Sequence, residues 1–174
     1  MERQDVEQRA AALFRSGLNC AESVLAAVLA GRGLEVEGVT RLGTAFGAGA
    51  GRSKVELCGA LSGGFIALGY LRGRRSGDER WDDVAALAAG VRRRFEAEHG
   101  CTACGSVLMA LGPQENMDKC IQLSAETAGY FHEALDNPQA LASAAAAPCG
   151  CSARQSTPAA PAGGPATTGG CGGD

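Results

Sequence analysis

The chain has 174 residues, a hydrophobic content of 45% and a formal net charge of −3, with a pI of about 5.4. This length favours a single domain with a hydrophobic core, and the slightly acidic balance argues against nucleic acid or an anionic membrane as a partner. The longest apolar run, residues 58–71, is shorter than the ~20 residues of a membrane span, so we expect no membrane insertion.

Apolar spacing and a capping residue predict three helices in the first third of the chain. Apolar residues recur at helical spacing over residues 3–15. Asn19 is a good N-cap for a helix over residues 20–30, with Glu22 in its first turn. Residues 38–46 are predicted to form a short helix that runs into a glycine-rich segment.

Two longer helices are predicted in the middle of the chain. Residues 58–71 are apolar but contain Gly63 and Gly64. Glycine inside a helix costs about 1 kcal/mol relative to alanine, so this pair indicates that another backbone or a bulky cofactor packs closely. Residues 78–99 form an amphipathic helix with one apolar stripe that begins at Trp81.

The last predicted helices complete an all-α fold. Residues 104–111 are apolar and short, and Asn116 is expected to cap a final helix that runs to about Leu135. No segment shows the alternation of a β-strand. We therefore expect a compact bundle of about five to six helices in a domain of residues 1–147.

Residues 148–174 have a different composition. Eleven of these 27 residues are Gly or Pro, and none is Val, Ile, Leu, Met, Phe, Tyr or Trp. Such a segment cannot bury enough apolar surface to offset the entropy of ordering it. The composition predicts a disordered C-terminal tail.

The eight cysteines are the main functional signal in the sequence. Residues 1–9 alternate charges and lack an apolar signal core, which predicts a cytoplasmic protein. Thiols are kept reduced in that compartment, so a framework of structural disulfides is not expected. This many thiols indicates redox, sulfur or metal chemistry.

Four cysteines fall at or near the starts of predicted helices: Cys20, Cys58, Cys104 and Cys120. The first turn of a helix has free N–H groups and the positive end of the helix dipole, and both stabilise a thiolate. We expect these four side chains to converge on one redox site. Cys101, three residues before Cys104, is a fifth candidate.

Several motifs resemble one known family. They are Asn19-Cys20-Ala21-Glu22, the glycine-rich loop that ends at Arg52, and Cys58-Gly59-Ala60-x-x-Gly63. Together they resemble the C_GCAxxG_C_C family of redox-active proteins over about residues 10–135. Its four characteristic cysteines match Cys20, Cys58 and Cys120, with the third matching Cys101 or Cys104; we choose Cys104 because it precedes the apolar helix. The resemblance implies a small helical domain that binds a redox group or cycles its thiols.

The residues leave the cofactor open. Thiolate ligands suit an Fe–S cluster, zinc or copper, and Cys20, Cys58, Cys104 and Cys120, with Cys101 as a further ligand, are the candidates to bind it. Closely spaced ferredoxin cysteines are absent. A disulfide among the same residues is the other option. Either chemistry predicts electron transfer with a redox or sulfur-transfer protein as partner. The sequence leaves open whether the protein has an oxidoreductase-type or sulfur-transfer activity. It also leaves open whether the protein forms a homo-oligomer.

Three cysteines lie in the predicted tail: Cys149, Cys151 and Cys171. Glycine pairs flank Cys171, so its thiol is unhindered. About twenty flexible residues between Cys151 and Cys171 span roughly 25 Å, which would let Cys171 reach the folded domain. The alternative function is therefore a sulfur or metal carrier with Cys171 as its mobile thiol.

Overall fold

The computed structural model describes residues 1–138, and in this range the all-α prediction is confirmed. It contains six α-helices and two short 3-10 helices, η1 (Val39–Leu42) and η2 (Thr44–Phe46). The α-helices are α1 (Arg3–Arg15), α2 (Cys20–Ala30), α3 (Gly59–Arg72), α4 (Asp82–His99), α5 (Cys104–Leu111) and α6 (Asp118–Asp136).

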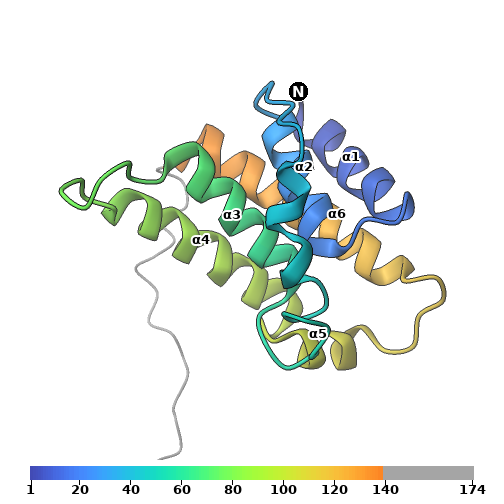
Figure 1. The fold of residues 1–174 in the computed structure, drawn as a ribbon. Helices are drawn as coiled ribbons and strands as arrows, with labels where there is room; N and C mark the ends of the chain where they lie inside the picture. The colour runs from blue at the N-terminus through green and yellow to red at the C-terminus, as the bar shows by residue number, and fades with distance from the viewer. Residues whose placement is uncertain (139–174) are drawn as a thin grey trace, which may run out of the picture.

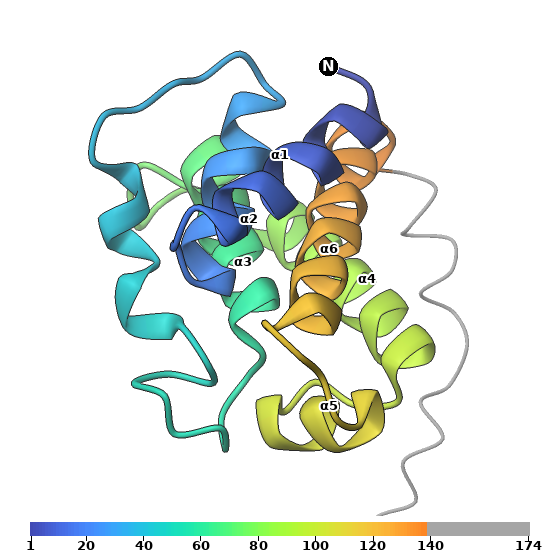
Figure 2. The same ribbon diagram turned by 90° about the vertical axis from the view of Figure 1, so that its right-hand side faces the viewer.

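Helix α2 lies at the centre of the bundle. It contacts α1, α3 and α6, and Val24, Leu25, Val28 and Leu29 have no exposed surface. Helix α4 covers the opposite side of α3 and α6 (Figure 1). Figure 2 shows α5 at one end of the bundle, below the N-terminal ends of α3 and α6. The helix starts that carry cysteines therefore gather at this end.

The boundaries of α1, α2 and α5 agree with the prediction. Asn19 caps α2 as expected, because its side chain accepts hydrogen bonds from the N–H groups of Ala21 and Glu22 at 2.9 and 3.1 Å. Glu22 completes a capping box by accepting from the Asn19 N–H at 2.7 Å. This cap fixes the backbone conformation at Cys20.

Three of the helix predictions need correction. The helix expected over residues 38–46 is two 3-10 helices separated at Gly43. Helix α4 begins at Asp82 rather than at residue 78, so Trp81 precedes it and is 60% exposed instead of joining the apolar stripe. Asn116 does not cap α6, because it and Met117 have positive φ values of 48° and 62°.

The glycine pair in α3 allows close helix packing. A Cβ on Gly63 would overlap the carbonyl of Ala21 in α2, and one on Gly64 would overlap the ring of Phe131 in α6. Another backbone and an aromatic ring thus occupy the space for which the sequence suggested a backbone or a cofactor. The glycines set the distances of α3 from α2 and α6.

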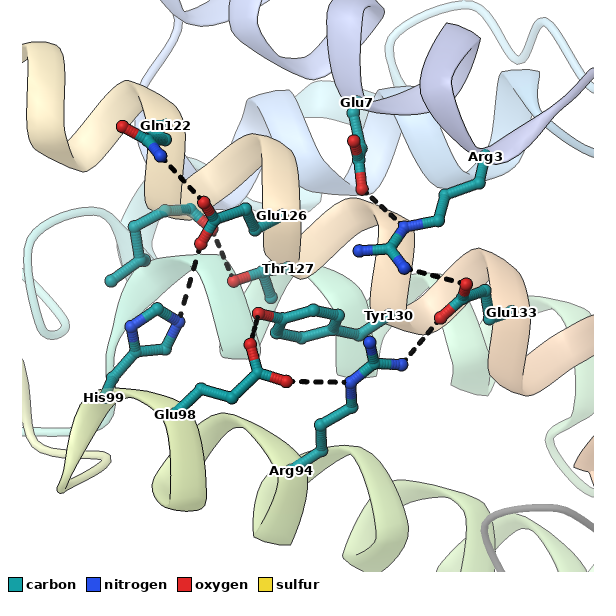
Figure 3. A network of polar contacts seen from close by, with 11 residues as sticks. Arg3, Glu7, Arg94, Glu98, His99, Gln122, Glu126, Thr127, Tyr130 and Glu133 are labelled. Atoms are coloured by element: carbon teal, nitrogen blue, oxygen red, sulfur yellow. Dashed lines mark hydrogen bonds and ion pairs between the residues drawn. The ribbon is translucent and has the colours of Figure 1, made fainter.

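A network of polar contacts ties α1, α4 and α6 together (Figure 3). Glu133 accepts hydrogen bonds from Arg3 at 2.8 Å and from Arg94 at 2.6 Å. Arg94 also lies over the ring of Tyr130, 4.2 Å from its centroid. Tyr130 donates to Glu98, and this bond, with that from Arg94, lowers the pKa of the Glu98 carboxyl.

The predicted domain boundary at residue 147 and the tail with Cys149, Cys151 and Cys171 lie outside the described residues. Among the helices of residues 1–138, none has both the length and the apolar character needed to cross a membrane.

We predict that Gly63→Ala destabilises the protein by about 1–3 kcal/mol, because its Cβ overpacks against the backbone of α2. Gly69→Ala in the same helix is the control. It has open space at its Cβ and should be neutral or stabilising by up to about 1 kcal/mol. Urea denaturation followed by far-UV circular dichroism measures both. Equal effects of the two substitutions would contradict the close-packing argument.

Candidate functional site

The four cysteines at the helix starts line one pocket. It has a volume of about 790 Å³, and its wall includes Cys20, Cys58, Cys104 and Cys120. They come from the starts of α2, α3, α5 and α6, so 100 residues of sequence separate the first from the last. The fold brings the predicted group together.

A short backbone pairing places Cys58 and Cys104 on adjacent segments. The Cys58 N–H donates to the Thr102 carbonyl, and the Cys104 N–H donates to the Glu56 carbonyl, both at 2.8 Å. These bonds flank an isolated antiparallel bridge between residues 57 and 103. In such a pairing the residues on either side of the bridge point to the same face, which directs both cysteines towards the pocket.

Glycines keep space clear beside two of the thiols. A Cβ on Gly59 would overlap the Sγ atom of Cys20, and a Cβ on Gly49 would lie 2.7 Å from the Cβ of Cys104. Gly59 directly follows Cys58 in the sequence, so the sulfur of Cys20 lies against the residue next to Cys58. Replacing either glycine would displace a pocket cysteine.

The loop before α3 has a left-handed backbone. Residues 48–52 all have φ values between 52° and 75°, although only Gly49 and Gly51 favour that conformation. Backbone hydrogen bonds hold it, including those from the Arg52 N–H to the Gly47 carbonyl and from the Lys54 N–H to the Ala48 carbonyl. Strained backbone of this kind clusters at functional sites.

Burial controls the protonation of the pocket thiols. It raises the pKa of Cys58 to about 12, and it raises the pKa of Cys20 and of Cys104. The N–H groups at the helix starts, such as Ala60 for Cys58, do lower these pKa values, but burial outweighs them. The expected stabilising effect of the helix starts is therefore present at Cys20 and Cys58, but burial outweighs it.

The charges of the pocket cysteines also affect one another. After burial, a charge on Cys20 is the largest influence that raises the pKa of Cys58, and charges on Cys20 and Cys120 raise that of Cys104. Cys120 likewise raises the pKa of Cys20. Lys54, on the pocket wall, opposes these effects at Cys104. Cys20 and Cys104 are thus each coupled to the other three thiols, since a charge on Cys104 also raises the pKa of Cys58.

Cys120 has a side-chain partner that sequence reasoning missed. The Gln114 Nε2–H donates to the Cys120 Sγ atom at 3.2 Å, and the Gln114 Oε1 atom accepts from the Cys120 N–H at 3.0 Å. Gln114 lies between α5 and α6 and also lines the pocket. No periodicity or motif distinguishes it in the sequence.

Cys101 is not among the residues that line this pocket. It is half-buried, packs against the hydrophobic core and donates to the His99 carbonyl at 3.8 Å. The tail cysteines fall outside the described residues, so their predicted carrier role stays a prediction.

A bound metal ion would need several ligand side chains that face one point in the pocket. Thiolate sulfurs suit iron, zinc and copper. Within residues 1–138, however, no three or more His, Cys, Asp or Glu side chains are arranged so that they could hold a metal ion. The cysteines as they lie do not fit a metal ion.

A family model described as "Putative redox-active protein (C_GCAxxG_C_C)" matches residues 18–134. The match covers more than half of the chain and includes all four pocket cysteines. It confirms the resemblance inferred from the motifs. No curated protein and no solved structure gives a significant match.

We predict that Cys58 resists alkylation in the folded protein. A pKa of about 12 against an ordinary value of 9.0 makes the thiolate fraction at pH 8 about a thousandfold smaller. Iodoacetamide labelling at pH 8 followed by peptide mass spectrometry, with and without urea, measures this. Rapid labelling of Cys58 in the absence of urea would show that burial does not control its pKa.

Proposed function

The chain belongs to the C_GCAxxG_C_C family, and we propose that its pocket is a thiol–disulfide redox site. The observation that carries this proposal is the convergence of Cys20, Cys58, Cys104 and Cys120 on one pocket. Disulfide formation needs two neighbouring thiols, and the Sγ atom of Cys20 lies against Gly59, the residue that directly follows Cys58. The proposed disulfide therefore includes Cys20.

The proposed reaction transfers two electrons. Two pocket thiols lose two protons and two electrons and form one S–S bond, and the disulfide of a redox partner takes up both to become two thiols. The pocket thiols react only when deprotonated. The N–H groups of Ala21 and Ala48, which favour the charged form of Cys20, would stabilise the thiolate during exchange.

An Fe–S cluster is the alternative that the test must separate. Four cysteines are the usual number of cluster ligands, but the side chains as they lie do not form a metal-holding group in the described part of the chain. The disulfide proposal requires no rearrangement of four ligands around a common centre. For that reason it is the one that the geometry favours.

We predict that Cys20 forms a disulfide with another pocket cysteine when the protein is oxidised. The experiment uses the full chain with its tail cysteines replaced, Cys149→Ser, Cys151→Ser and Cys171→Ser, so that only folded-domain thiols react. The protein is equilibrated in dithiothreitol redox buffers, alkylated and mapped by mass spectrometry. Cys20→Ser should abolish the disulfide.

Cys101→Ser is the matched control, because Cys101 is a folded-domain cysteine outside the pocket. This variant should keep the disulfide and its midpoint potential. A disulfide restricted to Cys101 and Cys104 would contradict the proposal. Stoichiometric iron and acid-labile sulfide in the anaerobically purified protein would replace it with the cluster.

A further inference from the structure

Cys120 differs from the other pocket cysteines in how its sulfur is held. A side-chain amide group, Gln114 Nε2–H, donates to its Sγ atom at 3.2 Å. The sulfur of Cys20 receives backbone N–H groups instead and lies against Gly59. A hydrogen bond donated to sulfur stabilises the thiolate, and charge-assisted bonds of this kind are the stronger ones.

Cys120 is also more accessible than two of its neighbours. Cys58 is 6% and Cys104 is 7% exposed, whereas Cys120 is only half-buried. Met117, one turn before it, lines the pocket and is 44% exposed. These exposures place Cys120 near the opening of the pocket.

The second hydrogen bond of Gln114 fixes the orientation of its amide group relative to Cys120. Because Oε1 accepts from the Cys120 backbone N–H at 3.0 Å, the amide group cannot rotate away without losing both contacts. Its Nε2 atom therefore faces the sulfur. Residues 116 and 117, which follow Gln114, have positive φ values and turn the chain into α6.

We propose that Cys120 is the attacking thiol of the pocket and that Gln114 is the residue that positions and activates it. The inference rests on the thiol–disulfide function proposed above and names the route by which the electrons leave. The partner is a molecule that carries a disulfide. Cys20 lines the same pocket and, unlike the buried Cys58 and Cys104, is half-buried as Cys120 is, so we assign it as the neighbour that completes the exchange.

The steps balance as two successive exchanges. The Cys120 thiolate attacks one sulfur of the partner disulfide, a mixed disulfide forms, and the other partner sulfur leaves as a thiolate that takes up a proton. The Cys20 thiol then loses its proton and attacks the Cys120 sulfur. The Cys20–Cys120 disulfide forms and the second partner thiol is released.

The first experiment traps the intermediate with glutathione disulfide as the probe. It uses the full chain with the three tail cysteines replaced by serine. In the Cys20→Ser variant the mixed disulfide cannot be resolved, so glutathione should accumulate on Cys120. Adding Cys120→Ser should lower the rate of glutathione attachment about tenfold or more, whereas adding Cys101→Ser should leave it unchanged.

The second experiment tests Gln114 with the isosteric substitution Gln114→Glu. The carboxylate can still accept from the Cys120 N–H, but it replaces the donor with a negative acceptor beside the sulfur. Attachment of glutathione at pH 7.5 should slow about tenfold, and the pH midpoint of Cys120 labelling should rise. A purely structural role would lower the thermal midpoint without moving this pH midpoint.

The outcomes separate the two proposals. If Cys20 forms its internal disulfide but glutathione accumulates on another cysteine, the assignment of Cys120 is wrong and the disulfide function stands. If the parent protein forms no Cys20 disulfide at any potential, the function itself fails. A small protein disulfide offered in parallel shows whether the pocket accepts protein or low-molecular-weight partners.

Discussion

The close approach of α3 to α2 is the constraint on which the pocket depends. Gly63 lets the α3 backbone touch the Ala21 carbonyl, and Gly59, one turn earlier, leaves room for the sulfur of Cys20. Because Cys58 directly precedes Gly59, the same contact brings Cys20 and Cys58 together. The spacing Cys-Gly-x-x-x-Gly in α3 therefore records two requirements, one for packing and one for the position of a thiol. A side chain at either glycine would separate the helices that carry the first two cysteines.

Burial and helix-start electrostatics act in opposite directions on these thiols. Helix starts direct N–H groups to the sulfurs of Cys20 and Cys58, yet both pKa values are raised because the thiolates would lose their hydration. The pocket therefore disfavours several charges at once, since a thiolate on Cys20 or Cys120 further raises the pKa of Cys104. A site of this kind suits chemistry in which one thiolate forms at a time, as in stepwise disulfide exchange. It is less suited to four simultaneous thiolates unless a cation compensates them.

Local signals in the sequence predicted much of the fold and the central group of the site. Asn19 with Glu22 is a capping pair whose geometry depends on neighbours in sequence alone, and it fixed the start of α2. The glycine pair in α3 indicated close packing, though not against which helices. Long-range contacts gave no such signal: the role of Gln114 depends on where α5 and α6 meet. Asparagine is a residue type that often caps helices, but Asn116 adopts a left-handed conformation, which asparagine also tolerates.

The left-handed loop at residues 48–52 lies against pocket cysteines from two different helices. Ala48 has a φ of 52°, which costs a non-glycine residue roughly 1 kcal/mol or more, and the same holds for Ala50. In return, the Ala48 N–H reaches the sulfur of Cys20, while Gly49 leaves room for Cys104. A right-handed turn would relieve the strain but would change the direction of both groups. The loop is therefore locally strained, and it lies between cysteines of α2 and α5 that are more than 80 residues apart in the sequence. Its strain is best explained by the geometry that the thiols require rather than by the stability of the bundle.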